Sequence, residues 1–184
     1  MARQNTKSLA PILGYWKEQD MQFRFIMAVV AAGALGFAAG AASAQGFDGA
    51  YAGIFGRDNP AAPTPVDIAF GAYAGYNFET GGGMVAGVEG EVEYDSAAVW
   101  GSNVVTATVN GRAGYAASDN VLVYGKAGVG AETATGGAVW DIGGGVEMNL
   151  GSNYRLRGEV ARVDPLAAGL ASRTDVKVGI GMGF

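Results

Sequence analysis

"DVKVGIGMGF", residues 175–184, stands at the end of the sequence and alternates with a period of two. One register is large and apolar, and consists of Val176, Val178, Ile180, Met182 and Phe184. The other register holds only charged residues and glycine, beginning with Asp175 and Lys177. Successive side chains of a β-strand point to opposite faces of its sheet. The stretch is therefore expected to form a strand with one apolar face and one face of small and charged residues.

The same alternation recurs through the chain after residue 44, where no window has the 3.6-residue period of an amphipathic helix. Each alternating segment has roughly the 9–11 residues that a tilted strand needs to cross a bilayer. Eight strands are expected, over residues 47–56, 67–78, 84–94, 103–115, 121–131, 138–149, 154–164 and 173–184.

Short and long connections alternate between these segments. The short connections are 79–83, 117–120 and 151–153, and the longer ones are 57–65, 96–103, 132–137 and 165–172. This alternation is typical of an up-and-down barrel whose hairpin turns gather at one end and whose loops gather at the other. The predicted fold is all-β, an eight-stranded antiparallel up-and-down transmembrane β-barrel preceded by a signal peptide.

One dipeptide conflicts with the strand count. Asn110-Gly111 is a strong hairpin signal, and a turn there would divide the segment 103–115. Each arm would then have only about five residues, which is too short to cross a bilayer. A continuous strand is therefore expected.

Charged residues fall almost entirely in one register of each strand. Glycines such as Gly87, Gly128 and Gly181 share that register. The interior of an eight-stranded barrel is barely wide enough for side chains, so long charged residues fit there only beside small ones. The charged register is therefore expected to form a polar network in the lumen: Glu89, Glu91, Glu93, Arg112, Lys126, Asp141, Glu147, Arg155, Arg157, Glu159, Asp175 and Lys177. The alternative is a soluble, secreted, lipocalin-like barrel, which would place the apolar register inside around a ligand.

Aromatic residues near the strand ends give a second indication of a membrane barrel. Two aromatic belts at the lipid interfaces are typical of such barrels. The predicted girdle consists of Phe47, Phe55, Phe70, Phe78, Tyr94, Tyr115, Trp140, Tyr154 and Phe184.

The first part of the chain has the features of an export signal. Residues 25–44 are apolar, follow Arg24, and end in the small residues Ala42, Ser43 and Ala44. This pattern predicts a signal peptide over 21–44, with cleavage between Ala44 and Gln45 and a barrel over 45–184. Residues 1–20 are polar and are interpreted as an extended n-region or a mis-assigned start.

Composition excludes several kinds of chemistry. The chain has neither cysteine nor histidine, which excludes disulfides, the usual zinc sites and histidine-dependent nucleophiles. Its net charge of −5 disfavours a nucleic-acid partner. No metal, no cofactor and no enzymatic activity are therefore expected.

The terminal stretch "VKVGIGMGF", together with "GRAGY" (111–115) and "VYGKAGVG" (123–130), resembles the small OmpA-type, opacity-like outer-membrane barrels of Gram-negative bacteria. The resemblance covers about residues 45–184 and implies an outer-membrane location, with lipid around the barrel. It also implies that the barrel-assembly machinery reads the last strand, which ends at Phe184. A peptidoglycan-binding domain like that of OmpA itself is not expected.

The expected role is structural, in envelope integrity or surface interaction, with ion pairs filling the lumen. Hairpin geometry predicts that Arg155 pairs with Glu147, Lys177 with Glu159, and Arg112 with Glu89. Buried charges need such partners because an unpaired buried charge costs several kcal/mol. The alternative is a narrow ion-conducting channel lined by the same groups.

Overall fold

The computed structural model describes residues 46–60, 68–95, 103–133, 137–151 and 153–184. It has eight strands: β1 (Gly49–Asp58), β2 (Ile68–Gly81), β3 (Met84–Asp95), β4 (Val104–Ser118), β5 (Val121–Glu132), β6 (Gly137–Asn149), β7 (Tyr154–Pro165) and β8 (Arg173–Gly183). The predicted segments 1–20 and 21–44, and the cleavage site between Ala44 and Gln45, lie outside the described residues. Within the described ranges, no helix is long and apolar enough to span a bilayer.

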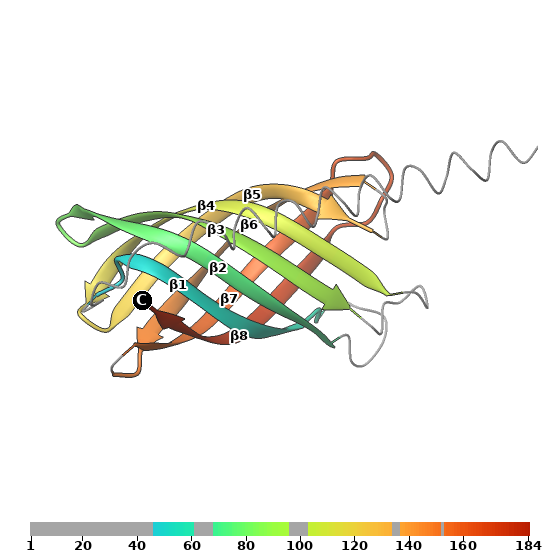
Figure 1. Cartoon of the computed structure of the whole chain (residues 1–184). Coiled ribbons are helices and arrows are strands. Elements are labelled where there is room, and N and C mark those ends of the chain that lie inside the picture. Colours follow the sequence, from blue (N-terminus) through green and yellow to red (C-terminus); the bar gives the residue numbers. More distant parts are fainter. Residues whose placement is uncertain (1–45, 61–67, 96–102, 134–136, 152) are drawn as a thin grey trace, which may run out of the picture.

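The strands form one closed antiparallel barrel. Each strand pairs with the next in sequence, and β1 also pairs with β8, so that Tyr51 lies opposite both Gly75 of β2 and Gly183 of β8. Figure 1 shows the strands tilted around a common axis, with β8 ending beside the start of β1. The predicted all-β fold, an eight-stranded antiparallel up-and-down barrel, is confirmed.

The two ends of the barrel differ in their connections. We call the end with the connections after β2, β4 and β6 the turn end, and the end with the connections after β1, β3, β5 and β7 the loop end. The predicted alternation of short and long connections fails at one place, because the connection after β5 (133–136) is as short as the one after β6 (150–153). The β2–β3 turn at the turn end uses Gly81, Gly82 and Gly83 at φ values of 93°, 63° and 80°. Glycine is the residue that adopts this left-handed region without strain, so the three glycines permit a tight reversal.

β4 runs through Asn110-Gly111 without a turn, as predicted. Asn110 pairs with Glu89 of β3 and Gly128 of β5, and Gly111 pairs with Val88 and Ala127. Because both neighbouring strands continue past this point, the sheet keeps the dipeptide extended. Pairing on both sides therefore overrides the local turn preference.

The barrel is apolar outside and charged inside. Large side chains such as Val129, Leu156 and Ile180 are exposed on the outer wall, whereas all twelve predicted lumen residues are buried. This polarity is the reverse of a lipocalin-like barrel, so the soluble alternative is wrong. Seven of the predicted girdle residues are exposed on the outer wall: Phe70, Phe78, Tyr94, Tyr115, Trp140, Tyr154 and Phe184.

The girdle prediction is wrong for Phe47 and Phe55, which lie inside the barrel and are buried. In β1 the odd-numbered residues point inward, so Phe55 shares the face of Arg57, while Ile54 faces outward and is 64% exposed. Phe47 precedes β1 and turns into the lumen at the turn end. An aromatic at the end of a strand therefore did not by itself indicate an outward position.

Glycines on the inner face make room for large inward side chains, as the sequence predicted. A Cβ atom on Gly71 would overlap the Phe55 ring, and one on Gly75 would overlap the Tyr51 ring and hydroxyl. A Cβ on Gly181 would lie 2.5 Å from the Tyr73 hydroxyl. Tyr51, Phe55 and Tyr73 thus form a buried aromatic cluster that only a glycine-lined wall accommodates.

Candidate functional site

The charged lumen residues form three clusters that follow one another along the barrel axis. The turn-end cluster consists of Glu89, Arg112, Glu147, Arg155 and Arg157. The central cluster consists of Glu91, Lys126, Asp141, Glu159 and Lys177. The loop-end cluster consists of Arg57, Glu93, Asp95, Glu132, Arg173 and Asp175. Within these clusters, every carboxylate lies within 4.0 Å of a guanidinium or ammonium nitrogen.

In the turn-end cluster, two guanidinium groups alternate with two carboxylates. Arg157 Nη2 lies 2.5 Å from Glu89 Oε2 and 2.7 Å from Glu147 Oε1. Arg112 contacts the same two carboxylates, at 3.1 Å from Glu89 Oε2 and 2.7 Å from Glu147 Oε1. Each buried charge therefore has two opposite neighbours, which offsets much of the cost of its burial.

Tyrosines complete this cluster. The Tyr51 hydroxyl donates to Glu89 Oε2 at 2.9 Å and accepts from Arg112 Nη1 at 2.5 Å. Arg157 lies over the Tyr73 ring, with Cζ 3.8 Å from the ring centroid, and Arg112 lies 4.0 Å from the Tyr124 centroid. Stacking on aromatic faces favours arginine over lysine at these positions because the guanidinium is planar and weakly hydrated.

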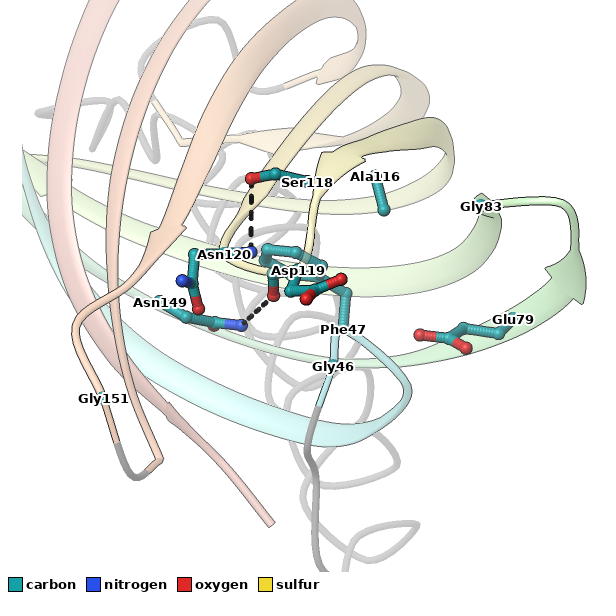
Figure 2. A pocket seen from close by; sticks show the side chains of 10 residues that line it. All are labelled: Gly46, Phe47, Glu79, Gly83, Ala116, Ser118, Asp119, Asn120, Asn149 and Gly151. Atoms are coloured by element: carbon teal, nitrogen blue, oxygen red, sulfur yellow. Dashed lines mark hydrogen bonds between the residues drawn. The ribbon is translucent and has the colours of Figure 1, made fainter.

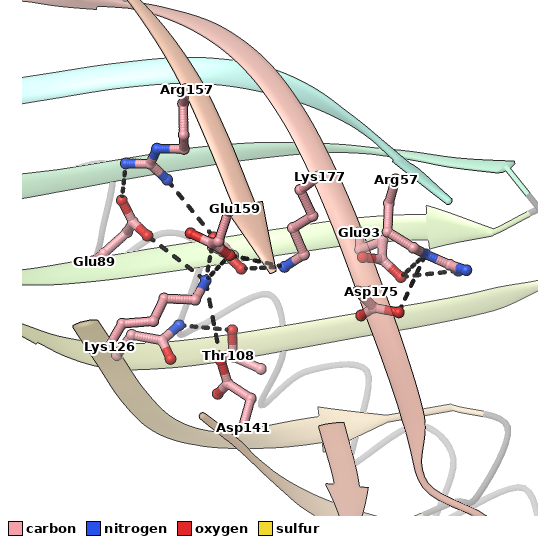
Figure 3. Close-up of polar contacts among 12 residues, drawn as sticks. Arg57, Glu89, Glu93, Thr108, Lys126, Asp141, Arg157, Glu159, Asp175 and Lys177 are labelled. Carbon is pink, nitrogen blue, oxygen red and sulfur yellow. Dashed lines mark hydrogen bonds and ion pairs between the residues drawn. The ribbon is translucent and has the colours of Figure 1, made fainter. Parts of the chain in front are cut away.

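The central cluster is built around two lysines (Figure 3). Lys126 Nζ lies 2.7 Å from both Glu91 Oε1 and Glu159 Oε1, and Lys177 Nζ lies 2.8 Å from Glu91 Oε2. Oxygens of Glu89, Glu91 and Glu159 lie within 4.8 Å of one another, a spacing compatible with a metal ion. The Lys126 ammonium already lies within 4.0 Å of all three carboxylates and supplies the positive charge that a metal ion would otherwise provide.

The loop-end cluster was only partly predicted. Arg57 Nη2 lies 2.7 Å from Asp95 Oδ2 and 3.1 Å from Glu93 Oε1. Arg173 forms an ion pair with Glu132 and lies 3.1 Å from Asp175. Only Glu93 and Asp175 of this cluster were among the predicted lumen residues.

The sequence contained a signal for the residues that were missed. Residues separated by an even number of positions lie on the same face of a strand. Tyr124 therefore shares the face of Lys126, and Arg57 shares the face of Tyr51. Asp95 likewise continues the Glu89, Glu91 and Glu93 register of β3. Extending the charged registers of Glu93, Lys126 and Asp175 to the ends of their strands would have included Asp95, Glu132 and Arg173, whereas the strand expected over 47–56 had no predicted lumen residue from which Arg57 could be reached.

All three ion pairs predicted from hairpin geometry are present, although two of them are long. Arg112 and Glu89 are 3.1 Å apart, whereas Arg155 lies 3.9 Å from Glu147 and Lys177 lies 3.8 Å from Glu159. The shortest ion pairs of Glu147 are instead with Arg112 and Arg157, and the shortest ion pair of Glu159 is with Lys126. Contacts across the lumen, such as Lys177 of β8 with Glu91 of β3, connect strands that are not neighbours in the sheet.

Comparison with known proteins agrees with this architecture. A family model described as outer membrane protein beta-barrel domain matches residues 28–184. The structure is similar to the N-terminal β-barrel domain of Pseudomonas aeruginosa OprF, at 13% sequence identity and a TM-score of 0.54, over 76% of this chain and 100% of that one. It is also similar to Ail, the attachment invasion locus protein of Yersinia pestis, at 15% identity and a TM-score of 0.51, over 74% of this chain and 100% of that one. No curated protein matches the sequence significantly.

Proposed function

Because the chain belongs to the outer membrane protein β-barrel family, we propose that it serves as a closed structural barrel of the outer membrane, in envelope integrity or surface interaction. The exposed apolar side chains of its outer wall contact lipid, and the turn end corresponds to the periplasmic side, as is general for such barrels. The proposal depends on one observation, which is the set of three ion-paired clusters in the lumen.

These clusters support a structural role rather than a path for ions. The side chains of Glu89, Glu159 and Lys126 are fully buried, and the Lys126 ammonium faces both carboxylates. An ion that crosses the lumen would have to displace these contacts and leave buried charges unpaired. The same pairing argues against acid–base catalysis by Glu89 and Glu91, because both carboxylates are engaged by cations.

Recording from a planar lipid bilayer tests the proposal. The purified barrel is expected to give no discrete conductance steps, because its lumen charges are paired at three successive levels. A porin with an open lumen, reconstituted in the same way, serves as the positive control. Discrete steps from the wild-type barrel would instead support the alternative of a narrow channel.

We also propose that the barrel-assembly machinery contacts the last strand through Phe184. The Phe184 side chain is exposed at the turn end, and its backbone N–H donates to the Ala50 carbonyl oxygen at 2.9 Å. The aromatic ring is therefore available to a partner, while the backbone joins β8 to β1.

Replacing Phe184 with Ala is expected to lower the amount of heat-modifiable, folded barrel in cells several-fold without changing refolding of the urea-unfolded chain into detergent. The physical reason is that the exposed ring contributes to recognition and little to packing. Phe78→Ala is the matched control, because Phe78 is also an exposed aromatic near the turn end. An equal loss of folded protein in both variants, or a refolding defect in Phe184→Ala, would contradict the assignment.

A further inference from the structure

A short segment ahead of β1 enters the lumen at the turn end. Phe47 is 1% exposed, and its ring packs with Val85 of β3 and with Leu122 and Tyr124 of β5. β5 lies on the opposite side of the eight-stranded barrel from β1, so the ring reaches across the lumen. Phe47 therefore contributes an apolar layer that spans the barrel on the turn-end side of the charged clusters.

The backbone of this segment is held from two sides. Asn77 Nδ2 of β2 donates to the Phe47 carbonyl oxygen at 2.9 Å, and Arg155 Nη2 of β7 donates to the Gly46 carbonyl oxygen at 3.2 Å. The Arg155 guanidinium also lies 5.4 Å from the centroid of the Phe47 ring. Strands on both sides of β1 thus fix the position of the segment.

Two glycines and an aspartate complete the anchoring. Gly46 and Gly49 have φ values of 131° and 91°, which permit the chain to bend into the lumen and out again. The Asp48 carboxylate accepts from the backbone N–H of Glu79 at 3.2 Å. Residues 46–48 themselves belong to no strand, so the sheet does not need to open for the segment to leave.

The segment lies at the boundary between a pocket and the lumen. A pocket of about 610 Å³ at the turn end is lined by Gly46, Phe47, Glu79, Gly83, Ala116, Ser118, Asp119, Asn120, Asn149 and Gly151. Figure 2 shows Gly46 and Phe47 in the middle of this group, between the β4–β5 turn and the β2–β3 turn. Phe47 therefore separates the pocket from the turn-end cluster.

We propose that residues 46–48 form a cork, a releasable closure of the periplasmic mouth that opens while the barrel stays folded. Among the described residues, the segment is held by one aromatic ring and three side-chain hydrogen bonds, whereas the barrel wall is held by eight strand pairings. Segments with few anchoring contacts open locally at a much lower free energy than the sheet around them. Release of the cork exposes Val85, Leu122 and the turn-end cluster to the periplasm. The central and loop-end clusters remain closed.

Thiol labelling tests the cork directly, because the chain contains no cysteine. Val85→Cys places a single thiol beside the Phe47 ring, and its reaction with a charged methanethiosulfonate reagent is followed by mass spectrometry in the detergent-folded protein. Adding Phe47→Ala is expected to accelerate labelling at least about tenfold, because the apolar cover of the thiol is lost. Phe55→Ala is the matched control, since Phe55 is a buried inward phenylalanine nearer the loop end. It is expected to leave the rate unchanged.

A second pair of variants leaves the interior intact. Asp48→Ala removes the acceptor for Glu79 N–H and is expected to accelerate labelling of Cys-substituted Val85 several-fold, with heat modifiability unchanged. Asp119→Ala, which removes an exposed carboxylate from the same mouth, is expected to leave the rate as it was. Unchanged labelling in Phe47→Ala and Asp48→Ala would overturn the cork. Equal acceleration by Phe55→Ala would also overturn it, by showing a general loosening of the barrel.

Discussion

Replacement of Arg157 with Met is expected to lower the free energy of unfolding by about 3–5 kcal/mol, the usual effect of removing one partner from a buried ion pair. Arg157 Nη2 is the shared neighbour of Glu89 and Glu147, and its guanidinium also stacks on Tyr73. Methionine fills similar space but leaves both carboxylates facing mainly Arg112. The loss therefore comes from uncompensated buried charge rather than from a cavity.

Urea unfolding of the detergent-folded barrel, followed by heat modifiability and tryptophan fluorescence, measures this effect. Arg162→Met is the matched control, because Arg162 lies on the same strand but is exposed and pairs with Asp164 at the surface. Its unfolding midpoint is expected to stay close to that of the wild type. Equal midpoints for Arg157→Met and the wild type would show that the turn-end cluster does not stabilise the barrel.

Gly75→Val is expected to destabilise the barrel by about 3 kcal/mol, the upper end of the usual cost of overpacking. The new Cβ would overlap the Tyr51 ring and hydroxyl and lie 2.6 Å from the Val88 carbonyl oxygen, which belongs to the sheet and cannot move aside. Strand propensity alone predicts that the substitution raises the free energy of unfolding, because valine is favoured over glycine in strands. The sign of the change in unfolding free energy therefore separates lumen crowding from local preference.

Gly158→Val is the control for this substitution. Gly158 faces outward on β7, and nothing lies within 4 Å of the position that its Cβ would occupy. Unfolding in urea is expected to require the same or more denaturant than for the wild type, because the new side chain meets lipid or detergent. If Gly75→Val and Gly158→Val unfold at the same urea concentration, the packing of the lumen does not require glycine on the inner face.

The strand pattern was largely readable from the sequence because a membrane barrel imposes the same alternation on every strand. The last strand was expected over 173–184 and spans Arg173–Gly183, and the strand through Asn110 is continuous as expected. β1 was the exception. Its adjacent Ile54 and Phe55 are both apolar, and its charges stand in both registers, Arg57 in one and Asp58 in the other, so the pattern does not decide which face points inward.

Partners across the lumen were harder to predict for a geometric reason. Alternation gives the face of a residue, and hairpin register gives its neighbours on adjacent strands. The contact between Lys177 and Glu91 depends instead on the tilt and stagger of a closed sheet, which bring non-neighbouring strands to one level. The contacts that Tyr51 and Tyr73 make with the turn-end cluster depend on the same stagger of the strands.

The three clusters also give the interior an electrical polarity along its axis. Counting each group in its ordinary charged form, the loop end holds four carboxylates (Glu93, Asp95, Glu132, Asp175) against two guanidiniums (Arg57, Arg173), an excess of two negative charges. The turn end holds three guanidiniums (Arg112, Arg155, Arg157) against two carboxylates (Glu89, Glu147), an excess of one positive charge. A cation that enters at the loop end would be repelled at the turn end, and an anion would be turned back at the loop end. Charge layering thus adds a barrier for ions of either sign to the physical obstruction of the bore.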